Sequence, residues 1–250
     1  MKRLYLIAIL VALAARDGIA QPPRVPVLVE LYTSEGCSSC PPADVLLESL
    51  SRDQPVARAE VVAVGLHVDY FDHLGWKDTF SSRSFTARQR SYSPVFGDDN
   101  LYTPQIVVDG EKAIPGTDGD IVRREIAAAA ARPHLAVRVA ARLAAARVQL
   151  TIEAPAAPTT AEKIQIVAAI TEDGLSSVVT RGENNGRTLH HVAVARSVQV
   201  FDALTARSAV VEKQLNFEKN WNPGALKAVV WLQGVKSREV YGAGSARITN

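Results

Sequence analysis

The two cysteines of this 250-residue chain are separated by only two serines, in the segment Cys37-Ser38-Ser39-Cys40. Such a pair can cycle between dithiol and disulfide, supply half of a metal site, or form a plain structural bridge. In disulfide exchange the thiolate is the nucleophile, and a neighbouring thiol resolves the mixed disulfide. We expect Cys37, which lies nearer the preceding apolar run, to attack, and Cys40 to resolve.

The alternatives to a redox site differ in what they require of the rest of the chain. A structural disulfide here would close a very short loop, so its entropic contribution to stability would be small. A structural zinc site needs about four ligands, and the sequence holds no second cysteine pair. Copper could be bound by both thiolates and one histidine, either His67 or His73. The sequence favours the redox site, leaves the copper site and the static bridge as alternatives, and indicates no other cofactor.

Apolar patterns predict the elements that position the cysteines. The β-branched apolar run at 27–31 predicts a buried strand, and helical spacing over 43–50 predicts a helix after the cysteines. A Cys-x-x-Cys between a buried strand and a helix is typical of a thioredoxin-like redox site. The helix N-terminus has unpaired amides and a positive dipole end, both of which stabilise a thiolate.

The same patterns predict two domains. Further strands are expected at 60–68, 106–108 and 112–114, and further helices at 81–92 and 121–131. This alternation predicts an α/β domain over residues 21–132, and the position of the Cys-x-x-Cys within it is typical of a thioredoxin-like domain. From residue 135 to 250, short runs separated by turn signals predict an all-β, sandwich-like domain.

The first twenty residues have the pattern of a secretory signal peptide. Lys2 and Arg3 precede an apolar run over 4–15, and Gly18-Ile19-Ala20 supplies the small residues of a cleavage site. An uncleaved N-terminal anchor is the alternative. We expect residues 1–20 to be removed and the protein to be exported to the periplasm or the medium, where disulfides persist. No later segment is long and apolar enough to predict a membrane span.

Five stretches of the chain together resemble a known family. They are ELYTSEGCSSCPPAD (30–44), HVDYFDHLGWKD (67–78), FTARQRSY (85–92), YTPQIVVDG (102–110) and GENNGRTLHHVAVAR (182–196). In this order they resemble an exported bacterial thioredoxin-like family catalogued as a domain of unknown function, DUF1223. The resemblance spans nearly the whole mature chain. Because the activity of that family is not established, it implies a fold and not a reaction.

The resemblance to the thioredoxin superfamily also implies a role for Thr103 and Pro104. Thioredoxin-like proteins hold a cis proline before a strand, beside the cysteine pair, and X-Pro bonds adopt the cis form at low cost. Such a proline leaves the preceding backbone free to pair with an extended substrate peptide. Pro104 matches by position, so we expect a cis bond there and a place for Pro104 in the docking groove.

The residues beside the cysteines depart from the pattern of thioredoxin-like enzymes. Gly36 stands where an aromatic residue often precedes the first cysteine, and Pro41 and Pro42 follow the second. A proline disfavours helical geometry in the residue before it, so Cys40 and Pro41 are expected to be non-helical. The helix is then expected to begin at about Pro42, with Cys37 further from its amides.

Charged and hydroxyl groups near the pair act in opposite directions. Glu35 and Asp44 would disfavour a thiolate if their carboxylates lay close. Ser38 and Ser39 could donate hydrogen bonds to sulfur and so favour it. We expect a modestly reactive pair that is less oxidising than a dedicated disulfide donor.

The positions of several other polar residues suggest what each of them does. His67 and Asp69 lie at the C-terminal end of the second predicted strand, where alternation would put them on the same side. His67 could shuttle protons, bind a metal or take part in a capping network. We interpret the arginines of the helix at 81–92 (Arg83, Arg88 and Arg90) as a solvated face. Residues 182–187 have the composition of a structural turn. His190 and His191 are adjacent on a predicted strand and are expected on opposite faces.

The leading hypothesis is an exported thiol-disulfide oxidoreductase that uses Cys37 and Cys40, with protein or small-molecule thiols and disulfides as partners. One alternative is a non-catalytic binding module in which the same pair is a static bridge. The other is a copper carrier using Cys37, Cys40 and His67. The net charge of +2, from 28 basic and 26 acidic residues, gives no support to a nucleic-acid partner.

Overall fold

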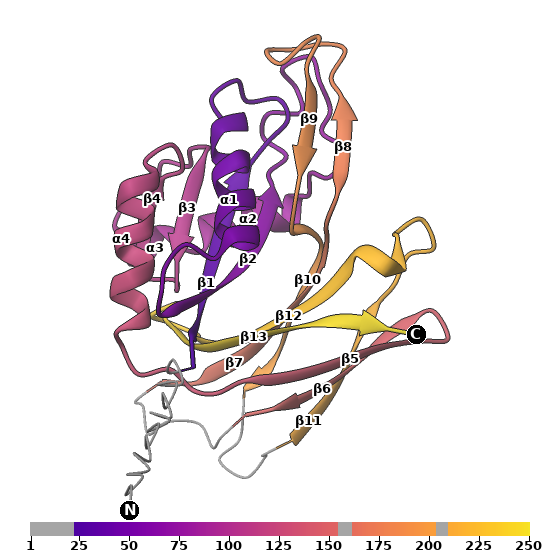
Figure 1. Cartoon of the computed structure of the whole chain (residues 1–250). Helices are drawn as coiled ribbons and strands as arrows, with labels where there is room; N and C mark the ends of the chain where they lie inside the picture. The colour runs from indigo at the N-terminus through magenta and orange to yellow at the C-terminus, as the bar shows by residue number, and fades with distance from the viewer. Residues whose placement is uncertain (1–22, 155–161, 204–209) are drawn as a thin grey trace, which may run out of the picture.

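The computed structural model describes residues 23–154, 162–203 and 210–250 (Figure 1). The predicted signal peptide, residues 1–20, lies outside the described residues. Of the described residues, 43% are in strands and 19% in helices. No helix among them is both long enough and apolar enough to cross a membrane.

The described elements up to α4 are a mixture of strands and helices, and those after it are strands except for one 3-10 helix. The helices are α1 (Pro41–Asp53), α2 (Arg83–Arg90), α3 (Ser93–Phe96), α4 (Gly119–Ala130) and the 3-10 helix η1 (Pro223–Ala225). The strands are β1 (Val25–Thr33), β2 (Ala59–His67), β3 (Gln105–Val108), β4 (Lys112–Pro115), β5 (Arg138–Ala144), β6 (Arg147–Glu153), β7 (Ile164–Glu172), β8 (Leu175–Val178), β9 (Thr188–His191), β10 (Val194–Ala203), β11 (Val210–Asn216), β12 (Leu226–Gly234) and β13 (Val240–Thr249).

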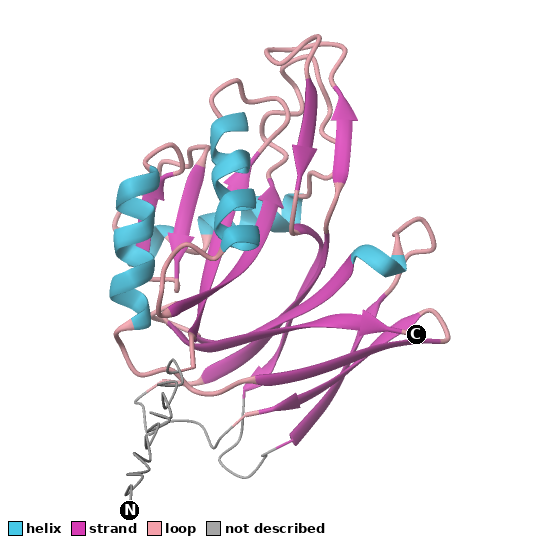
Figure 2. Ribbon diagram, in the orientation of Figure 1, coloured by secondary structure: helices cyan, strands magenta, loops and turns pink. Residues whose placement is uncertain are grey.

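Eleven of these strands form one mixed sheet, in the order β11-β6-β5-β13-β12-β7-β10-β2-β1-β3-β4. The expected fold class, an α/β thioredoxin-like domain followed by a separate sandwich-like domain, was therefore wrong. The strands of both expected parts join where β10 pairs with β2, at Val194 and Gly65. There the Gly65 amide donates a 2.8 Å hydrogen bond to the Ala193 carbonyl. Figure 2 shows the continuous run of strands.

The end of the sheet formed by β1 to β4 is covered by helices on both faces. In Figure 1, α1 and α4 lie on one face and α2 on the other. Because successive side chains of a strand point to opposite faces, β1 is buried on both sides. Its Val29 packs with Leu47 of α1 and Ile126 of α4, while its Leu28 shares a core with Phe85 of α2.

The core behind α2 also crosses the predicted boundary between the two domains. Phe85 shares that core with Val167 of β7 and Trp231 of β12. The boundary itself, at residues 132–135, falls in the link between α4 and β5. The division of the chain into domains at 21–132 and 135–250 stays a prediction.

Beyond β10 the sheet curls, so that β6 packs against β7 and β12. Leu150 and Ile152 of β6 share a buried core with Ile166 of β7 and Val230 of β12. Strands β8 and β9 form a separate two-stranded ribbon. This ribbon projects at the top of Figure 1, beside the first turn of α1.

Local patterns predicted most element positions but not every boundary. The predicted hairpin turn at Asp109-Gly110 is confirmed by positive φ angles of 45° and 73°. The prediction that Cys40 is non-helical was wrong: Cys40 is the N-cap of α1 and has helical angles of −78° and −36°. Its carbonyl accepts the first helical hydrogen bonds, which offset the steric preference that Pro41 imposes.

Candidate functional site

Cys37 and Cys40 form a disulfide at the junction of β1 and α1, with Cα atoms 5.4 Å apart. Cys37 is 2% exposed and Cys40 is fully buried, whereas Ser38 and Ser39 between them are exposed. The bridge thus lies just beneath the surface, under a loop that solvent reaches.

The N-terminus of α1 offers few amides to a thiolate. Pro41 and Pro42 have no N–H groups. The next two amides, of Ala43 and Asp44, donate to the carbonyl of Cys40 at 2.9 and 3.2 Å. The amide donors that usually stabilise an anion at a helix start are therefore absent or occupied.

The sulfur of Cys37 has a hydroxyl and a carbonyl as polar neighbours. It lies 3.3 Å from Oγ of Ser39 and 3.9 Å from the carbonyl oxygen of Thr103. The Thr103–Pro104 peptide bond is cis, as expected. Gly116 lets this segment approach α1, because a Cβ at Gly116 would lie 2.9 Å from the Cβ atoms of both Pro104 and Ala43.

An aromatic residue at position 36, as the thioredoxin-like pattern often has, would crowd Phe71. A Cβ at Gly36 would lie 3.1 Å from the Cβ of Phe71. The Gly36 amide also donates to the hydroxyl of Ser34 at 3.1 Å. Phe71, from the loop after β2, therefore packs directly on the cysteine segment.

The turn between β8 and β9 contacts the cysteine loop, which the sequence did not predict. The side-chain amide of Asn184 donates to the carbonyls of Glu35 and Cys37, each at 2.9 Å. The Ser38 amide donates to Oε2 of Glu183 at 3.0 Å. Hydrogen bonding from Ser38 holds the pKa of Glu183 below its ordinary value. Residues 182–187 are thus more than the structural turn we expected, and their place in the stretch resembling the family was the available signal.

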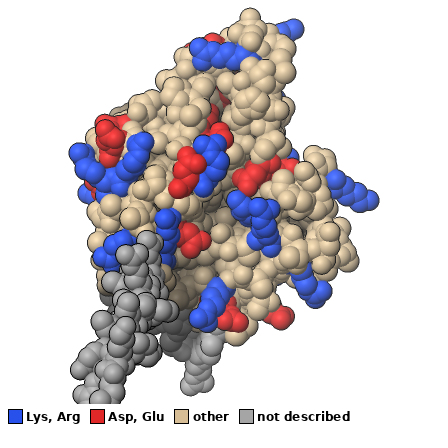
Figure 3. All heavy atoms as spheres, in the orientation of Figure 1, with Lys and Arg blue, Asp and Glu red and all other residues tan. Residues whose placement is uncertain are grey.

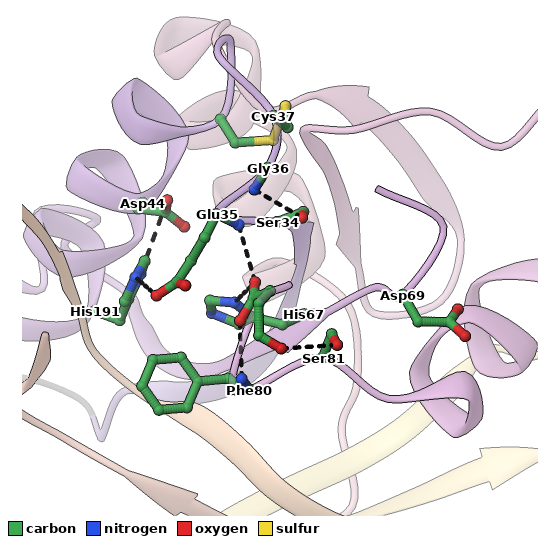
Figure 4. A network of polar contacts seen from close by, with 12 residues as sticks. Ser34, Glu35, Gly36, Cys37, Asp44, His67, Asp69, Phe80, Ser81 and His191 are labelled. Carbon is green, nitrogen blue, oxygen red and sulfur yellow. Dashed lines mark hydrogen bonds and ion pairs between the residues drawn. A yellow bond between two sulfur atoms is a disulfide. The ribbon is translucent and has the colours of Figure 1, made fainter. Parts of the chain in front are cut away.

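A buried polar cluster lies beneath the disulfide (Figure 4). Nδ1 of His67, at the end of β2, lies 2.6 Å from Oδ2 of Asp78. Asp78 also accepts hydrogen bonds from the amides of Glu35 and Phe80, at 2.9 and 2.8 Å. These bonds tie the loop after β2 to the cysteine segment.

His67 and Asp69, which were expected on the same side of the second strand, are not brought together. The strand ends at His67, so alternation no longer governs Asp69, whose carboxylate accepts a 2.6 Å hydrogen bond from Thr86. Figure 4 shows Asp69 pointing away from His67. The actual partner, Asp78, was missed because it lies in a loop without periodicity.

The second half of the cluster joins the strand β9 to the cysteine segment. Nε2 of His191 lies 3.3 Å from Oε1 of Glu35, and the indole N–H of Trp76 donates to Oε2 of Glu35 at 2.8 Å. Nδ1 of His191 lies 3.9 Å from Oδ2 of Asp44. His191 is buried and His190 exposed, which confirms their expected opposite faces.

Burial and mutual charge shift the pKa values of three groups in this cluster. Burial raises the pKa of Asp44 to about 6, although His191 and His67 oppose the shift. Burial disfavours the charged form of His67, but the charge and hydrogen bond of Asp78, together with Asp44 and Glu35, leave its pKa raised. The pKa of Asp78 is lowered, because His67 and the hydrogen bonds outweigh burial.

The described residues do not gather a metal site. Across residues 23–154, 162–203 and 210–250, no group of three or more His, Cys, Asp or Glu side chains is arranged to hold a metal ion. The copper set of Cys37, Cys40 and His67 is therefore not brought together. Both sulfurs are joined to each other, and His67 is paired with Asp78.

A second buried network lies on the other face of the sheet. Arg88 of α2 donates to both carboxylate oxygens of Glu30 in β1, at 2.5 and 3.0 Å, and to Gln233 of β12 at 3.2 Å. The interpretation of Arg88 as solvated was wrong, although Arg83 and Arg90 are exposed. The burial of Arg88 could have been predicted from its spacing, because Arg88 lies three residues after Phe85 and therefore on the apolar side of α2.

The surface charges form no single-sign patch in the view of Figure 3. Basic and acidic side chains are interspersed over the face shown.

Comparisons with known proteins identify a family whose description assigns no function. The profile of a family described as “Protein of unknown function (DUF1223)” matches residues 28–233. No curated protein matches the sequence.

Two solved structures are similar over most of the chain. One is a crystal structure of an Agrobacterium tumefaciens protein that is 25% identical in sequence, with a TM-score of 0.69. The match includes 92% of this chain and 96% of that protein. The other is HBP35 of Porphyromonas gingivalis, which is 12% identical, with a TM-score of 0.64. The match includes 91% of this chain and 76% of HBP35. The second likeness indicates a shared fold alone.

Proposed function

Because this chain belongs to the DUF1223 family, whose description assigns no function, we propose from the site itself that it is an exported thiol-disulfide oxidoreductase. The observation that carries the proposal is the Cys37–Cys40 disulfide at a strand-to-helix junction, beside Thr103 and Pro104. The partners would be thiols and disulfides of proteins or small molecules. The N-terminal signal pattern supports a compartment in which such a bridge persists.

The proposed reaction passes two electrons from the dithiol form to a substrate disulfide. The thiolate of Cys37 attacks one substrate sulfur, forms a mixed disulfide and releases the other substrate sulfur as a thiolate that takes up a proton. The Cys40 thiol then loses its proton and attacks the Cys37 sulfur. The second substrate thiol leaves, and the Cys37–Cys40 bridge is restored.

The surroundings of the two sulfurs support this division of roles. Cys37 precedes two exposed serines, whereas Cys40 is fully buried at the helix start. The hydroxyl of Ser39 lies close enough to donate a hydrogen bond to a Cys37 thiolate. The Thr103 carbonyl, which lies next to the same sulfur, borders the approach of a substrate.

Several features support a weak oxidant rather than a strong one. A strong oxidant stabilises its reduced form, usually through a favoured thiolate. Here Pro41 and Pro42 supply no amides, and the following two amides bind the Cys40 carbonyl. The carboxylates of Glu35 and Asp44 also lie in the cluster beneath the bridge (Figure 4). A weakly stabilised thiolate favours the disulfide form.

A second candidate function is a non-catalytic binding module with a static bridge. The low exposure of both cysteines favours it, because an attacking thiol must reach a sulfur along the line of the S–S bond. The two candidates differ in whether the folded protein exchanges disulfides.

Trapping of the mixed disulfide tests the proposal. Cys40→Ser leaves Cys37 without a resolving thiol, so we expect it to accumulate a stable mixed disulfide with a test disulfide such as oxidised glutathione. Cys37→Ser is expected to form far less, since Cys40 is buried. The proposal fails if neither variant forms an adduct and the wild-type protein does not accelerate reduction of insulin by dithiothreitol. In that case the second candidate, a binding module with a static bridge, is the function that stands.

A further inference from the structure

The β8–β9 turn reaches the cysteine loop from about 145 positions along the chain. Asn184 at its centre is fully buried, although its neighbours in the turn are exposed. Both hydrogens of its side-chain amide are used, one on the Glu35 carbonyl and one on the Cys37 carbonyl. Its Oδ1 accepts a 3.1 Å hydrogen bond from Arg187, which fixes the orientation of the amide.

The turn is itself held against the site. Gly182 has a φ of 73°, and a Cβ there would lie 3.2 Å from the Cβ of Trp76. The indole of Trp76 in turn donates to the Glu35 carboxylate. The β8–β9 turn and the loop after β2 thus both contact the cysteine segment.

The hydrogen bonds of Asn184 are present in the structure together with the disulfide. On reduction, the two sulfurs must move apart from bonding distance to van der Waals contact. Cys40 is fixed by the helical hydrogen bonds to its carbonyl from Ala43 and Asp44. Because the Cys40 backbone is held in the helix, we expect any backbone adjustment on reduction to fall on the Cys37 side, where Asn184 holds the carbonyl. Contacts that are better in one redox state shift the equilibrium toward that state.

We propose that Asn184 is a positioning residue of the redox site, which holds the backbone of residues 35–37 in its disulfide conformation and so disfavours reduction. This inference rests on the proposed function. Reduction by dithiothreitol passes two electrons and two protons to the bridge and leaves oxidised dithiothreitol and the Cys37–Cys40 dithiol. Asn184 takes no part in the bond changes and acts on their equilibrium.

A redox equilibrium with three variants tests this role. Wild type, Asn184→Ala and the matched control Asn185→Ala are equilibrated in mixtures of reduced and oxidised dithiothreitol, quenched with acid and alkylated, and the dithiol fraction is measured by mass spectrometry. Asn185 is an exposed neighbour in the same turn. Loss of two hydrogen bonds is expected to shift the equilibrium of Asn184→Ala about ten-fold toward the dithiol. Asn185→Ala is expected to stay within about two-fold of wild type.

Arg187→Ala provides a second, milder variant in case Asn184→Ala does not fold. Arg187 is exposed and orients the Asn184 amide, so we expect a smaller shift in the same direction. An unchanged equilibrium in both variants, or a shift toward the disulfide, would overturn the inference. Equal destabilisation of the oxidised and reduced forms would assign Asn184 to packing alone.

The outcomes separate this inference from the proposed function. If the wild-type bridge exchanges reversibly and the Asn184 variant has the same equilibrium, only the inference fails. If the wild-type bridge does not exchange in the folded protein, the proposed function fails, and the role of Asn184 falls with it.

Discussion

The side-chain amide of Asn184 donates a 2.9 Å hydrogen bond to the carbonyl of Cys37, 147 positions earlier in the chain. The cysteine site is therefore completed by a ribbon, β8–β9, that is not part of the main sheet. Residues from β2 and its following loop complete it from the other side, through His67 and Asp78. The bridge is therefore surrounded by residues that are distant from it in sequence.

Removing the charge of Glu183 should make the reduced site more reactive. The Glu183 carboxylate accepts from the Ser38 amide beside Cys37, and a negative charge there disfavours a thiolate. Because Glu183 is exposed and screened by salt, we expect Glu183→Gln to raise the alkylation rate of the reduced protein by iodoacetamide only about two-fold. Glu218→Gln, at another exposed glutamate, should leave the rate unchanged. A wild-type rate for Glu183→Gln at low salt would count against this electrostatic role.

Asp44→Asn should stabilise the protein at neutral pH but not at pH 4. The pKa of Asp44 is about 6 in the folded protein, against an ordinary value of 3.8. Between these values the folded state keeps a proton that the unfolded chain releases, so stability falls as the pH rises through this window. Asparagine does not titrate, so the variant should gain ~2 kcal/mol relative to wild type between pH 4 and pH 7. Urea unfolding at both pH values measures this, and a pH-independent difference would contradict it.

Asp78→Asn should lower the pKa of His67. The charge and hydrogen bond of Asp78 outweigh the burial that disfavours the charged imidazole, so without them the pKa should fall below the ordinary value of 6.5. NMR titration of the His67 ring measures the shift. In the wild type, the stability from the raised pKa is complete below pH 6.5 and is lost as the pH rises through the folded-state pKa.

A control separates this pair from the rest of the loop. Asp69→Asn changes a carboxylate of the same loop that bonds Thr86, so the pKa of His67 should keep its wild-type value. Asp78→Asn should also reduce the free energy of unfolding by roughly 3 kcal/mol, because it removes one partner of a buried pair. An unchanged His67 titration in Asp78→Asn would show that the pair does not determine it.

Glu30→Gln tests the buried network that joins the two parts of the sheet. It leaves the Arg88 guanidinium buried without its carboxylate, which should lower the free energy of unfolding by roughly 3–5 kcal/mol. Glu60→Gln, on the exposed side of the neighbouring strand β2, should change it by less than about 0.5 kcal/mol. Equal effects of the two substitutions, measured by urea unfolding, would contradict a structural role for the Glu30–Arg88 pair.

Local sequence patterns were sufficient for the elements around the cysteines. The apolar run before Cys37 and the helical spacing after Cys40 predicted β1 and α1, and Asp109-Gly110 predicted the hairpin turn. These features are determined by residues that are close together in the chain, so composition and periodicity are enough to predict them. The position of Pro104 likewise followed from the superfamily resemblance.

Contacts between distant segments could not be predicted in this way. The pairing of Gly65 with Val194 joins strands about 130 positions apart, and nothing in either segment specifies its neighbour. The partnership of His67 with Asp78 depends on the path of an irregular loop. Asn184 looked like a turn residue because its own neighbours, Gly182 and Gly186, do form a turn with positive φ angles.

Redox equilibration of the native Cys37–Cys40 bridge tests the central claim most directly. The protein is incubated across dithiothreitol and glutathione redox mixtures, the dithiol fraction is measured by alkylation, and tryptophan fluorescence reports whether the fold persists. We expect one reversible two-electron transition in the folded protein, at a potential more negative than about −200 mV. A bridge that is reduced only after the protein unfolds, or a potential near −120 mV typical of a strong oxidant, would contradict the account.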